Sequence, residues 1–339
     1  MRILFSVPYN QDPSIINAYR DRRDHVRDVY LPASPSFFTS GRDSFLTQSG
    51  CPDRTSRLAR ISDPGYDQEV QDIIDVLRPA GIGVDLLLNA SCDSGRFVNE
   101  REFARLIEYI SSFRHLSGVT LTNAYYARQI KEILPYLEIK ASVIAGIDTV
   151  RKAMYWEAFA KPDVIGVASD VNKSLPLLRN IRRAVHANIQ VIVNSGCMHG
   201  CPFFSQHYNY LSHVPRSATK KLSSGQPFSY ELLCRSIVDA APWTLLTCQY
   251  IAPKNLRYYE GIVDQFKLMD RALPTQEIIG YIDAYIEGTS SRILPYDPEW
   301  SFDEPASVFE RISTCDRNCA SCDWCKTTWY NEIVGKQTR

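Results

Sequence analysis

Short apolar runs alternate with helix-length amphipathic segments along most of this chain, and this alternation restricts the fold to very few classes. The runs are rich in Val, Ile and Leu, which is typical of parallel strands buried on both faces. We expect strands at Ile3–Val7, Val84–Asn89, Val119–Thr122, Ile139–Ile144, Val164–Ala168, Ile189–Asn194, Thr244–Gln249 and Asp264–Leu268. We expect helices at Asn99–Phe113, Ala124–Leu137, Val150–Phe159, Leu175–His186 and Gln276–Glu287. Eight such units predict an α/β protein of the (β/α)8 TIM-like barrel class.

A doubly wound open sheet is the alternative fold, but no glycine-rich dinucleotide fingerprint follows the first expected strand. Two regions depart from the alternation. Residues 9–67 read as a long insertion after strand 1, a possible lid, with a charged helical stretch at Ser14–Tyr30. Residues 293–339 form a Cys-rich C-terminal extension. We therefore divide the chain into a barrel, residues 1–292, and a metal-binding extension, residues 293–339.

Composition narrows the class of protein further. Lys and Arg number 38, as do Asp and Glu, so the net charge of +0 argues against a nucleic-acid partner. No apolar stretch approaches the roughly 20 residues needed to span a bilayer, and the N-terminus lacks the features of a signal peptide. We expect a cytoplasmic protein without membrane contact, in which clustered cysteines bind metal rather than form disulfides.

Eight of the ten cysteines follow residue 196, at the short intervals typical of metal ligands. Cys197 and Cys201 come directly after the sixth expected strand, so they face the end of the barrel where active sites lie. Cys234 follows in an expected helix, and Cys248 lies at the end of the seventh expected strand. Thiolates are soft ligands for iron–sulfur clusters, zinc and copper(I). We expect these four cysteines to bind a cofactor, and burial as small core residues is the alternative.

The tail holds a second group of four cysteines, Cys315, Cys319, Cys322 and Cys325. Their spacing allows neighbouring thiolates to converge on one centre, which would stabilise a segment poor in core-forming residues. The first three match the CxxxCxxC spacing of radical S-adenosylmethionine enzymes, but in those enzymes the triplet follows the first strand. An iron–sulfur cluster and a zinc ion held by four cysteines are the two interpretations.

Polar residues that could line a pocket follow several expected strands. They are Asn89, Asn123, Ser142, Ser169, Asp170, Asn172, Asn194 and Gln249, and helix capping is their alternative role. His207 is a candidate acid or base, and Asn209 a candidate substrate contact. The loop at Ser40–Arg42 is expected to close over the substrate, with Arg42 binding a carboxylate or phosphate, unless Arg42 is merely a solvated loop residue. No Ser/His/Asp order and no HExxH motif indicates a protease.

Two segments, Val193–His213 and Ile251–Arg271, resemble a divergent branch of the peptidase U32-like family. The shared features are a Cys-x3-Cys-Pro element with a trailing His-x-Asn, an Ile-x-Pro-x-x-Leu-x-x-Tyr-x-Gly segment, and a Cys-rich tail. The resemblance implies a TIM-barrel-like core. It also implies an oxygen-sensitive [4Fe-4S] cluster on four cysteines, because several relatives carry one and take part in oxygen-independent hydroxylation of ubiquinone precursors or RNA bases.

Carried over residue by residue, the resemblance makes Cys197 and Cys201 paired cluster ligands and Cys234 a third. Better-known members have a Cys-x6-Cys element upstream that this chain lacks, so the fourth ligand stays open. We expect an enzyme with one or two [4Fe-4S] clusters that modifies a small molecule or a peptide and receives electrons from a donor protein. The alternatives are a U32-type hydrolase or lyase with a structural zinc tail, and a non-catalytic subunit that carries a cluster for another enzyme.

Overall fold

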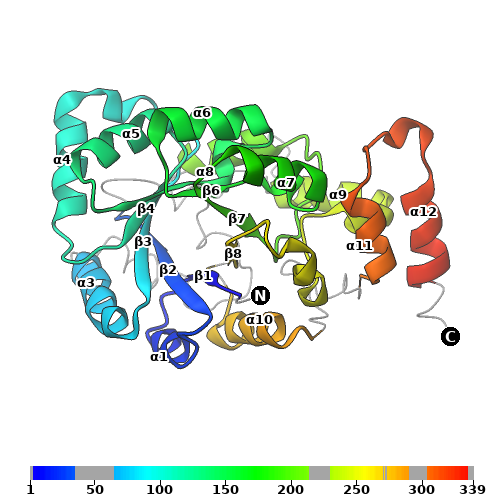
Figure 1. Cartoon of the computed structure of the whole chain (residues 1–339), viewed down its shortest axis with the longest axis horizontal. Helices are drawn as coiled ribbons and strands as arrows, with labels where there is room; N and C mark the ends of the chain where they lie inside the picture. The colour runs from blue at the N-terminus through cyan, green and yellow to red at the C-terminus, as the bar shows by residue number, and fades with distance from the viewer. Residues whose placement is uncertain are drawn as a thin grey trace, which may run out of the picture.

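The computed structural model describes residues 3–34, 65–213, 230–269, 271, 273–289 and 304–334. Its eight parallel strands form one closed barrel in chain order, with the helices packed around it (Figure 1). The strands are β1 (Phe5–Pro8), β2 (Val26–Pro32), β3 (Gly83–Leu88), β4 (Gly118–Leu121), β5 (Glu138–Ala141), β6 (Val164–Gly166), β7 (Asn188–Ile192) and β8 (Gln265–Lys267). The predicted (β/α)8 barrel is therefore confirmed, and the open sheet is excluded.

Helices cover the outside of the barrel, and the five helices named above are confirmed; three of them are shorter than predicted, and two extend one residue further. The helices are α1 (Ser14–Asp21), α3 (Gly65–Leu77), α4 (Glu100–Ser111), α5 (Ala124–Ile133), α6 (Val150–Ala160), α7 (Leu175–Ala184), α8 (Phe204–His213), α9 (Tyr230–Ala240), α10 (Thr275–Glu287), α11 (Ala306–Ser313) and α12 (Trp324–Thr328). Side chains of Asn99, Asn123 and Thr149 accept backbone N–H bonds at the starts of α4, α5 and α6. These caps satisfy donors that would otherwise lack partners.

Two details of the predicted strand pattern are wrong. The stretch Ser14–Tyr30 is not one helix, because α1 ends at Asp21 and β2 begins at Val26. Residues 9–34 of the predicted insertion therefore include a barrel strand and its preceding helix, while residues 35–64 lie outside the described residues. The predicted strand Thr244–Gln249 is instead the 3-10 helix η5 (Pro242–Thr247) followed by a turn. The two errors cancel in the strand count, which is why eight strands were still expected.

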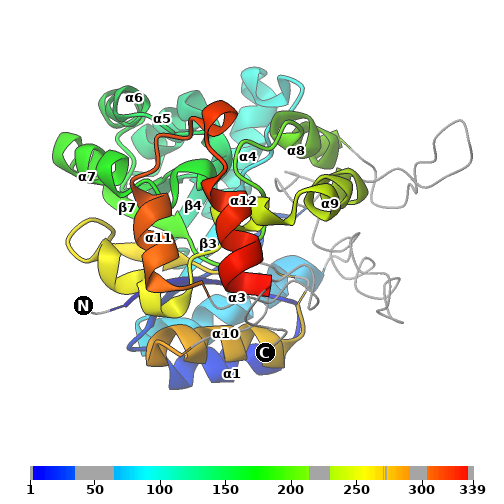
Figure 2. The same ribbon diagram turned by 90° about the vertical axis from the view of Figure 1, so that its right-hand side faces the viewer.

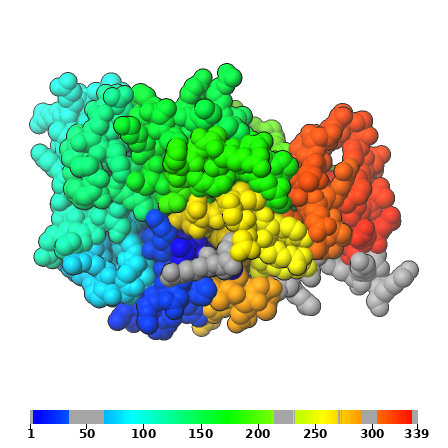
Figure 3. All heavy atoms as spheres, in the orientation of Figure 1, coloured from blue at the N-terminus to red at the C-terminus, as the bar shows by residue number. Residues whose placement is uncertain are grey.

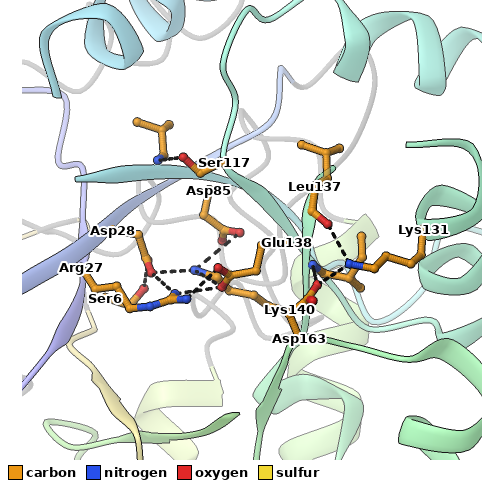
Figure 4. A network of polar contacts seen from close by, with 12 residues as sticks. Ser6, Arg27, Asp28, Asp85, Ser117, Lys131, Leu137, Glu138, Lys140 and Asp163 are labelled. Carbon is orange, nitrogen blue, oxygen red and sulfur yellow. Dashed lines mark hydrogen bonds and ion pairs between the residues drawn. The ribbon is translucent and has the colours of Figure 1, made fainter. Parts of the chain in front are cut away.

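The interior of the barrel is polar, whereas a TIM barrel is ordinarily filled by branched apolar side chains. Lys140 Nζ on β5 lies 2.7 Å from Asp28 Oδ2 on β2 and 3.8 Å from Asp85 Oδ1 on β3. Strands β2 and β5 are not neighbours in the ring, so this pair forms across the interior (Figure 4). Ser6 and Thr120 donate to Asp28 and Asp85 at 2.5 Å. The apolar core thus lies mainly between the strands and the helices.

The charges in this interior alter one another's pKa values. Burial raises the pKa of the Asp85 carboxyl to about 6, although Lys140 partly opposes the shift. Burial also disfavours the Asp28 carboxylate, but the fields of Lys140 and Arg27 outweigh it and lower the pKa of Asp28. The carboxylates in turn raise the pKa of Lys140 against the effect of its burial. Lys140 is therefore the cation with the largest effect on both buried carboxylates.

The C-terminal segment packs beside the barrel as a small lobe of its own (Figures 2 and 3). Helices α11 and α12 both contact η5, and a second apolar core joins them, with members such as Leu246, Ile312 and Trp329. A buried ion pair ties the lobe down, because Glu304 Oε1 lies 2.7 Å from Lys173 Nζ. Asn255 Nδ2 donates to the other Glu304 oxygen at 3.1 Å. The segment thus has apolar and polar anchors that do not depend on metal.

Among the helices of the described chain, none combines the length and the apolar character needed to cross a bilayer.

Candidate active site at the barrel mouth

The loop after β7 carries Cys197 and Cys201 at the C-terminal end of the barrel. Asn194 anchors the start of this loop to the end of β8, since its side chain donates to Met269 O at 2.7 Å and accepts from Met269 N at 2.6 Å. The residue before Asn194 is also held, because Ile251 N donates to Val193 O at 2.8 Å. Parallel strands end together at this face, which is where barrel enzymes carry their reactive groups.

Buried polar groups hold the backbone of Cys197. Its N–H donates to Ser195 Oγ at 3.3 Å, and its carbonyl accepts from Gln249 N at 3.0 Å. Ser195 Oγ donates to Gln249 Oε1 at 2.9 Å, and Gln249 Nε2 donates to Asp170 Oδ1 at 3.2 Å. The chain Asp170–Gln249–Ser195 therefore fixes one end of the cysteine loop, and two of the strand-end residues proposed from the sequence, Asp170 and Gln249, meet here.

The Cys201 and Cys234 side chains are hydrogen-bonded to each other, which brings α9 against the loop. This bond, opposed by partial burial and assisted by the Phe203 backbone and the nearby His207, lowers the pKa of the Cys201 thiol to about 6. At neutral pH Cys201 is then mostly thiolate, the form that acts as nucleophile or metal ligand. Two of the predicted ligands are thus adjacent in the structure, and one is ionised.

Thiol alkylation tests this electrostatic assignment. We expect iodoacetamide to modify Cys201 of metal-free protein with a rate that rises around pH 6, because only the thiolate reacts. Burial and the neighbouring tail cysteines raise the pKa of Cys325 to about 11, so Cys325 should stay unmodified near neutral pH. Replacing Cys234 by Ala removes the hydrogen bond and should shift the Cys201 profile to higher pH, as read by peptide mass spectrometry. An unchanged profile in Cys234→Ala would show that the two thiols do not interact.

His207 lies on the Cys201 side of α8, and Asn209 does not. The His207 ring stacks on Tyr230, with centroids 5.1 Å apart, and its charge acts on Cys201. Asn209 Oδ1 instead accepts from Ser91 Oγ at 2.7 Å, in the loop after β3. Positions two apart on a helix point in different directions, so the structure brings only one of the two near the thiols. The third candidate, Arg42, lies outside the described residues.

Cys248 is fully buried in the second apolar core. Burial raises the pKa of its thiol, so it is held in the neutral form. Its backbone neighbour Gln249 bonds to Cys197, which places Cys248 behind the cysteine loop. Its expected position at the end of a strand is wrong, since it caps η5.

The tail cysteines lie close enough for Cys315, Cys319 and Cys322 to raise the pKa of Cys325. The tail also approaches the mouth, because burial and the field of Arg317 together lower the pKa of His199 in the cysteine loop. His199 Nδ1 in turn lies 3.1 Å from Asp170 O. Within the described residues, however, no three His, Cys, Asp or Glu side chains gather as the ligands of a single metal ion.

Two remaining strand-end candidates have the alternative, structural role. Asn123 caps α5, and Ser142 accepts from Ile144 N and from Asn89 Nδ2, the latter at 3.4 Å. The interior charges Asp85, Lys140 and Lys267 were not among the candidates. Their signal is a single polar residue in the middle or at the end of an otherwise apolar strand, as in Val84-Asp-Leu and Ile139-Lys-Ala.

Among the comparisons with known proteins, one solved structure with a TM-score above 0.5 shares this architecture. No protein-family model matches the chain. A curated protein of Methanocaldococcus jannaschii, described as the uncharacterized protease MJ1657, is 24% identical over 299 residues, covering 84% of this chain and 87% of the relative. The solved structure of the U32 peptidase Mk0906 has a TM-score of 0.52 at 17% identity, covering 79% of this chain and 92% of that chain. The YdjI aldolase of Escherichia coli K12 has a TM-score of only 0.38 at 9% identity, covering 84% of this chain and 91% of that chain.

Proposed function

We propose that the thiols at the barrel mouth form the reactive centre of a U32-like enzyme. The U32-like resemblance drawn from the cysteine loop is confirmed by the comparisons. In this proposal Cys197, Cys201 and Cys234 hold a [4Fe-4S] cluster, and the substrate is a small molecule or a peptide. The reaction class that we propose is oxygen-independent hydroxylation.

The observation that carries the proposal is the hydrogen-bonded pair Cys201–Cys234, with Cys201 ionised and Cys197 on the same anchored loop. An all-sulfur donor set is typical of iron–sulfur ligation. When bound through three cysteines, the cluster would offer an open iron site to an oxygen-containing ligand.

The other residues of the mouth have roles in this proposal that follow from their positions. His207, beside Cys201, can hold or release a proton at the edge of the thiol group. The chain Asp170–Gln249–Ser195 keeps the loop in place and so positions Cys197. Hydroxylation oxidises the substrate by two electrons, so the oxygen-containing ligand must both deliver its oxygen and accept those two electrons. A donor protein would serve only to reduce the cluster before turnover. Cluster or zinc binding by the tail cysteines is a separate proposal.

Anaerobic purification tests the iron. We expect a brown protein with about four irons and four acid-labile sulfides per chain for one cluster, or twice that if the tail also binds a cluster. Cys201→Ala should lose the mouth cluster, while Cys92→Ala should keep it, since the Cys92 thiol accepts from Ser94 N in its own loop and is not one of the proposed ligands. A colourless wild-type protein without sulfide would contradict the proposal.

A second function is favoured by the same thiolate, namely peptide hydrolysis with Cys201 as nucleophile. The relative from M. jannaschii is described as a protease, and a low-pKa cysteine near a histidine is a recognised nucleophile. Iron-free protein that cleaves peptides and forms a Cys201 acyl adduct, detected by mass spectrometry, would establish this alternative. A cluster-loaded chain that turns over no substrate, yet reduces a partner, would identify an electron-transfer subunit.

A further inference from the structure

The last residue of β8, Lys267, points into the barrel. Its Nζ lies 4.1 Å from the centroid of the Tyr30 ring on β2, and β2 and β8 flank β1 on opposite sides. The Lys267 residue is 8% exposed, and it is at the carboxyl end of its strand, where groups can be reached from the mouth. Tyr30 is itself fixed, because its hydroxyl donates to Leu268 O at 2.7 Å.

Within the described residues, the Lys267 ammonium forms no hydrogen bond or ion pair; the Tyr30 ring lies 4.1 Å away, and the carboxylates of Asp85 and Asp28 act on it only through their fields. This contrasts with Lys140 and Lys173, the other buried lysines, which each lie 2.7 Å from a carboxylate. A buried cation without an acceptor is costly. Buried cations of this kind destabilise the fold, and they are usually found at reactive or binding sites.

Two amides on neighbouring positions are also unsatisfied. Gln265 lies two residues before Lys267, on the same face of β8, and pairs in register with Gln190 on β7. In the part of the chain that the structure describes, the Nε2 atoms of both are buried without a hydrogen-bond partner. In the loop after β1, both side-chain polar atoms of Gln11 are also buried without a hydrogen-bond partner among the described residues. The Gln11 backbone has a positive φ of 66°. Strained, unsatisfied groups of this kind cluster at binding sites.

The charges indicate the class of ligand. Asp28 and Asp85 already lie in the interior, and Lys140 serves both. Four charges act on the Lys267 ammonium, namely those of Asp85, Asp28, Lys140 and Arg271, and these two anions and two cations balance. Lys267 therefore adds one positive charge beside the two amides, which suits a monovalent anion better than a phosphate dianion. We infer that Lys267 binds the carboxylate of a small organic acid inside the barrel, with Gln190 and Gln265 hydrogen-bonding the same ligand. Burial lowers the pKa of Lys267 to about 8, so the carboxylate, which needs the ammonium form, should bind less tightly as pH rises from 7 to 9.

This site does not depend on the thiol centre, and its test can be read separately from that of the proposed function. Isothermal titration with pyruvate, acetate and inorganic phosphate would be run on wild type, Lys267→Met, Gln265→Met and Lys152→Met, the last changing an exposed lysine that pairs with Asp148. We expect pyruvate or acetate to bind wild type and Lys152→Met. Affinity should fall about tenfold or more in Lys267→Met, as for a lost charge-assisted hydrogen bond, and by less in Gln265→Met. Binding should persist in Cys201→Ala, whatever its iron content.

Thermal unfolding without ligand separates this role from a structural one. If Lys267 is a binding group, Lys267→Met should unfold at the same temperature as wild type or higher, because a buried cation has been removed. A lower unfolding temperature combined with unchanged carboxylate binding would overturn the inference, as would the absence of carboxylate binding to wild type. Phosphate binding through Lys267 in preference to both carboxylates would overturn the ligand class.

Discussion

Replacing Lys140 by Met is expected to lower the free energy of unfolding by about 3–5 kcal/mol at neutral pH, the usual loss when one partner of a buried ion pair is removed. Lys140 lies 2.7 Å from Asp28 and 3.8 Å from Asp85, and all three side chains are almost fully buried. Without the ammonium, the two carboxylates repel each other in a place that water hardly reaches. Urea unfolding followed by circular dichroism measures the loss.

The pH dependence of this loss has a definite sign. Removing Lys140 raises the pKa of both carboxyls in the folded protein, so the folded variant takes up protons more readily than the unfolded chain. The defect should therefore be largest near neutral pH and should shrink as pH falls and Asp85 and Asp28 become protonated. Lys152→Met, at an exposed pair, is the control and should change stability by less than about 1 kcal/mol. An equally small loss in Lys140→Met would mean that the interior pair is not formed.

Glu304→Ala is expected to destabilise the chain by a similar amount, about 3–5 kcal/mol, and to loosen the C-terminal lobe. Glu304 is fully buried, pairs with Lys173 at 2.7 Å and accepts from Asn255 at 3.1 Å. Its removal leaves the Lys173 ammonium with only the Leu246 carbonyl, at 3.3 Å. Limited proteolysis should cut the variant within the lobe faster than wild type, and urea unfolding gives the magnitude.

Glu332→Ala is the matched control for the lobe, because Glu332 lies on its exposed surface. It should leave both the unfolding curve and the proteolysis rate unchanged. Glu304→Gln retains the shape and one acceptor, so we expect a loss between those of the control and of Glu304→Ala. If Glu304→Ala behaves like the control, then the apolar contacts of α11 and α12 alone hold the lobe.

Much of the barrel could be predicted because most of its strands lie in apolar runs bounded by other residues, although β5 and β8 carry charged or amide side chains. β2 was missed because charged residues, Arg27 and Asp28, interrupt its apolar pattern next to a genuine helix. Arg27 and Asp28 pair with each other at 3.0 Å, but their burial also depends on distant partners, since Arg27 pairs with Glu138 at 2.7 Å and Asp28 with Lys140. No local pattern reports such partners. Conversely, Thr244–Gln249 is as apolar as a strand because it faces a second core that the tail completes.

The cysteine loop could be located from its spacing and from its position after a strand. The family resemblance named Cys201 and Cys234 as ligands of one centre, and the structure brings these two side chains into contact. The sequence carried no sign that the tail reaches the mouth, because the effect of Arg317 on His199 depends on how the lobe docks. The separation of His207 from Asn209 depends on the phase of α8, which spacing alone suggests but does not establish.

The most direct test of the thiol centre is Mössbauer spectroscopy of protein produced anaerobically with 57Fe. The wild type, Cys201→Ala and a variant with all four tail cysteines changed to Ala would be compared. We predict that the wild-type spectrum contains the signal of a [4Fe-4S] cluster, that this signal survives in the tail variant, and that Cys201→Ala loses it. A wild-type spectrum without a cluster, or a cluster that Cys201→Ala retains in full, would contradict the assignment of the barrel mouth as an iron–sulfur site.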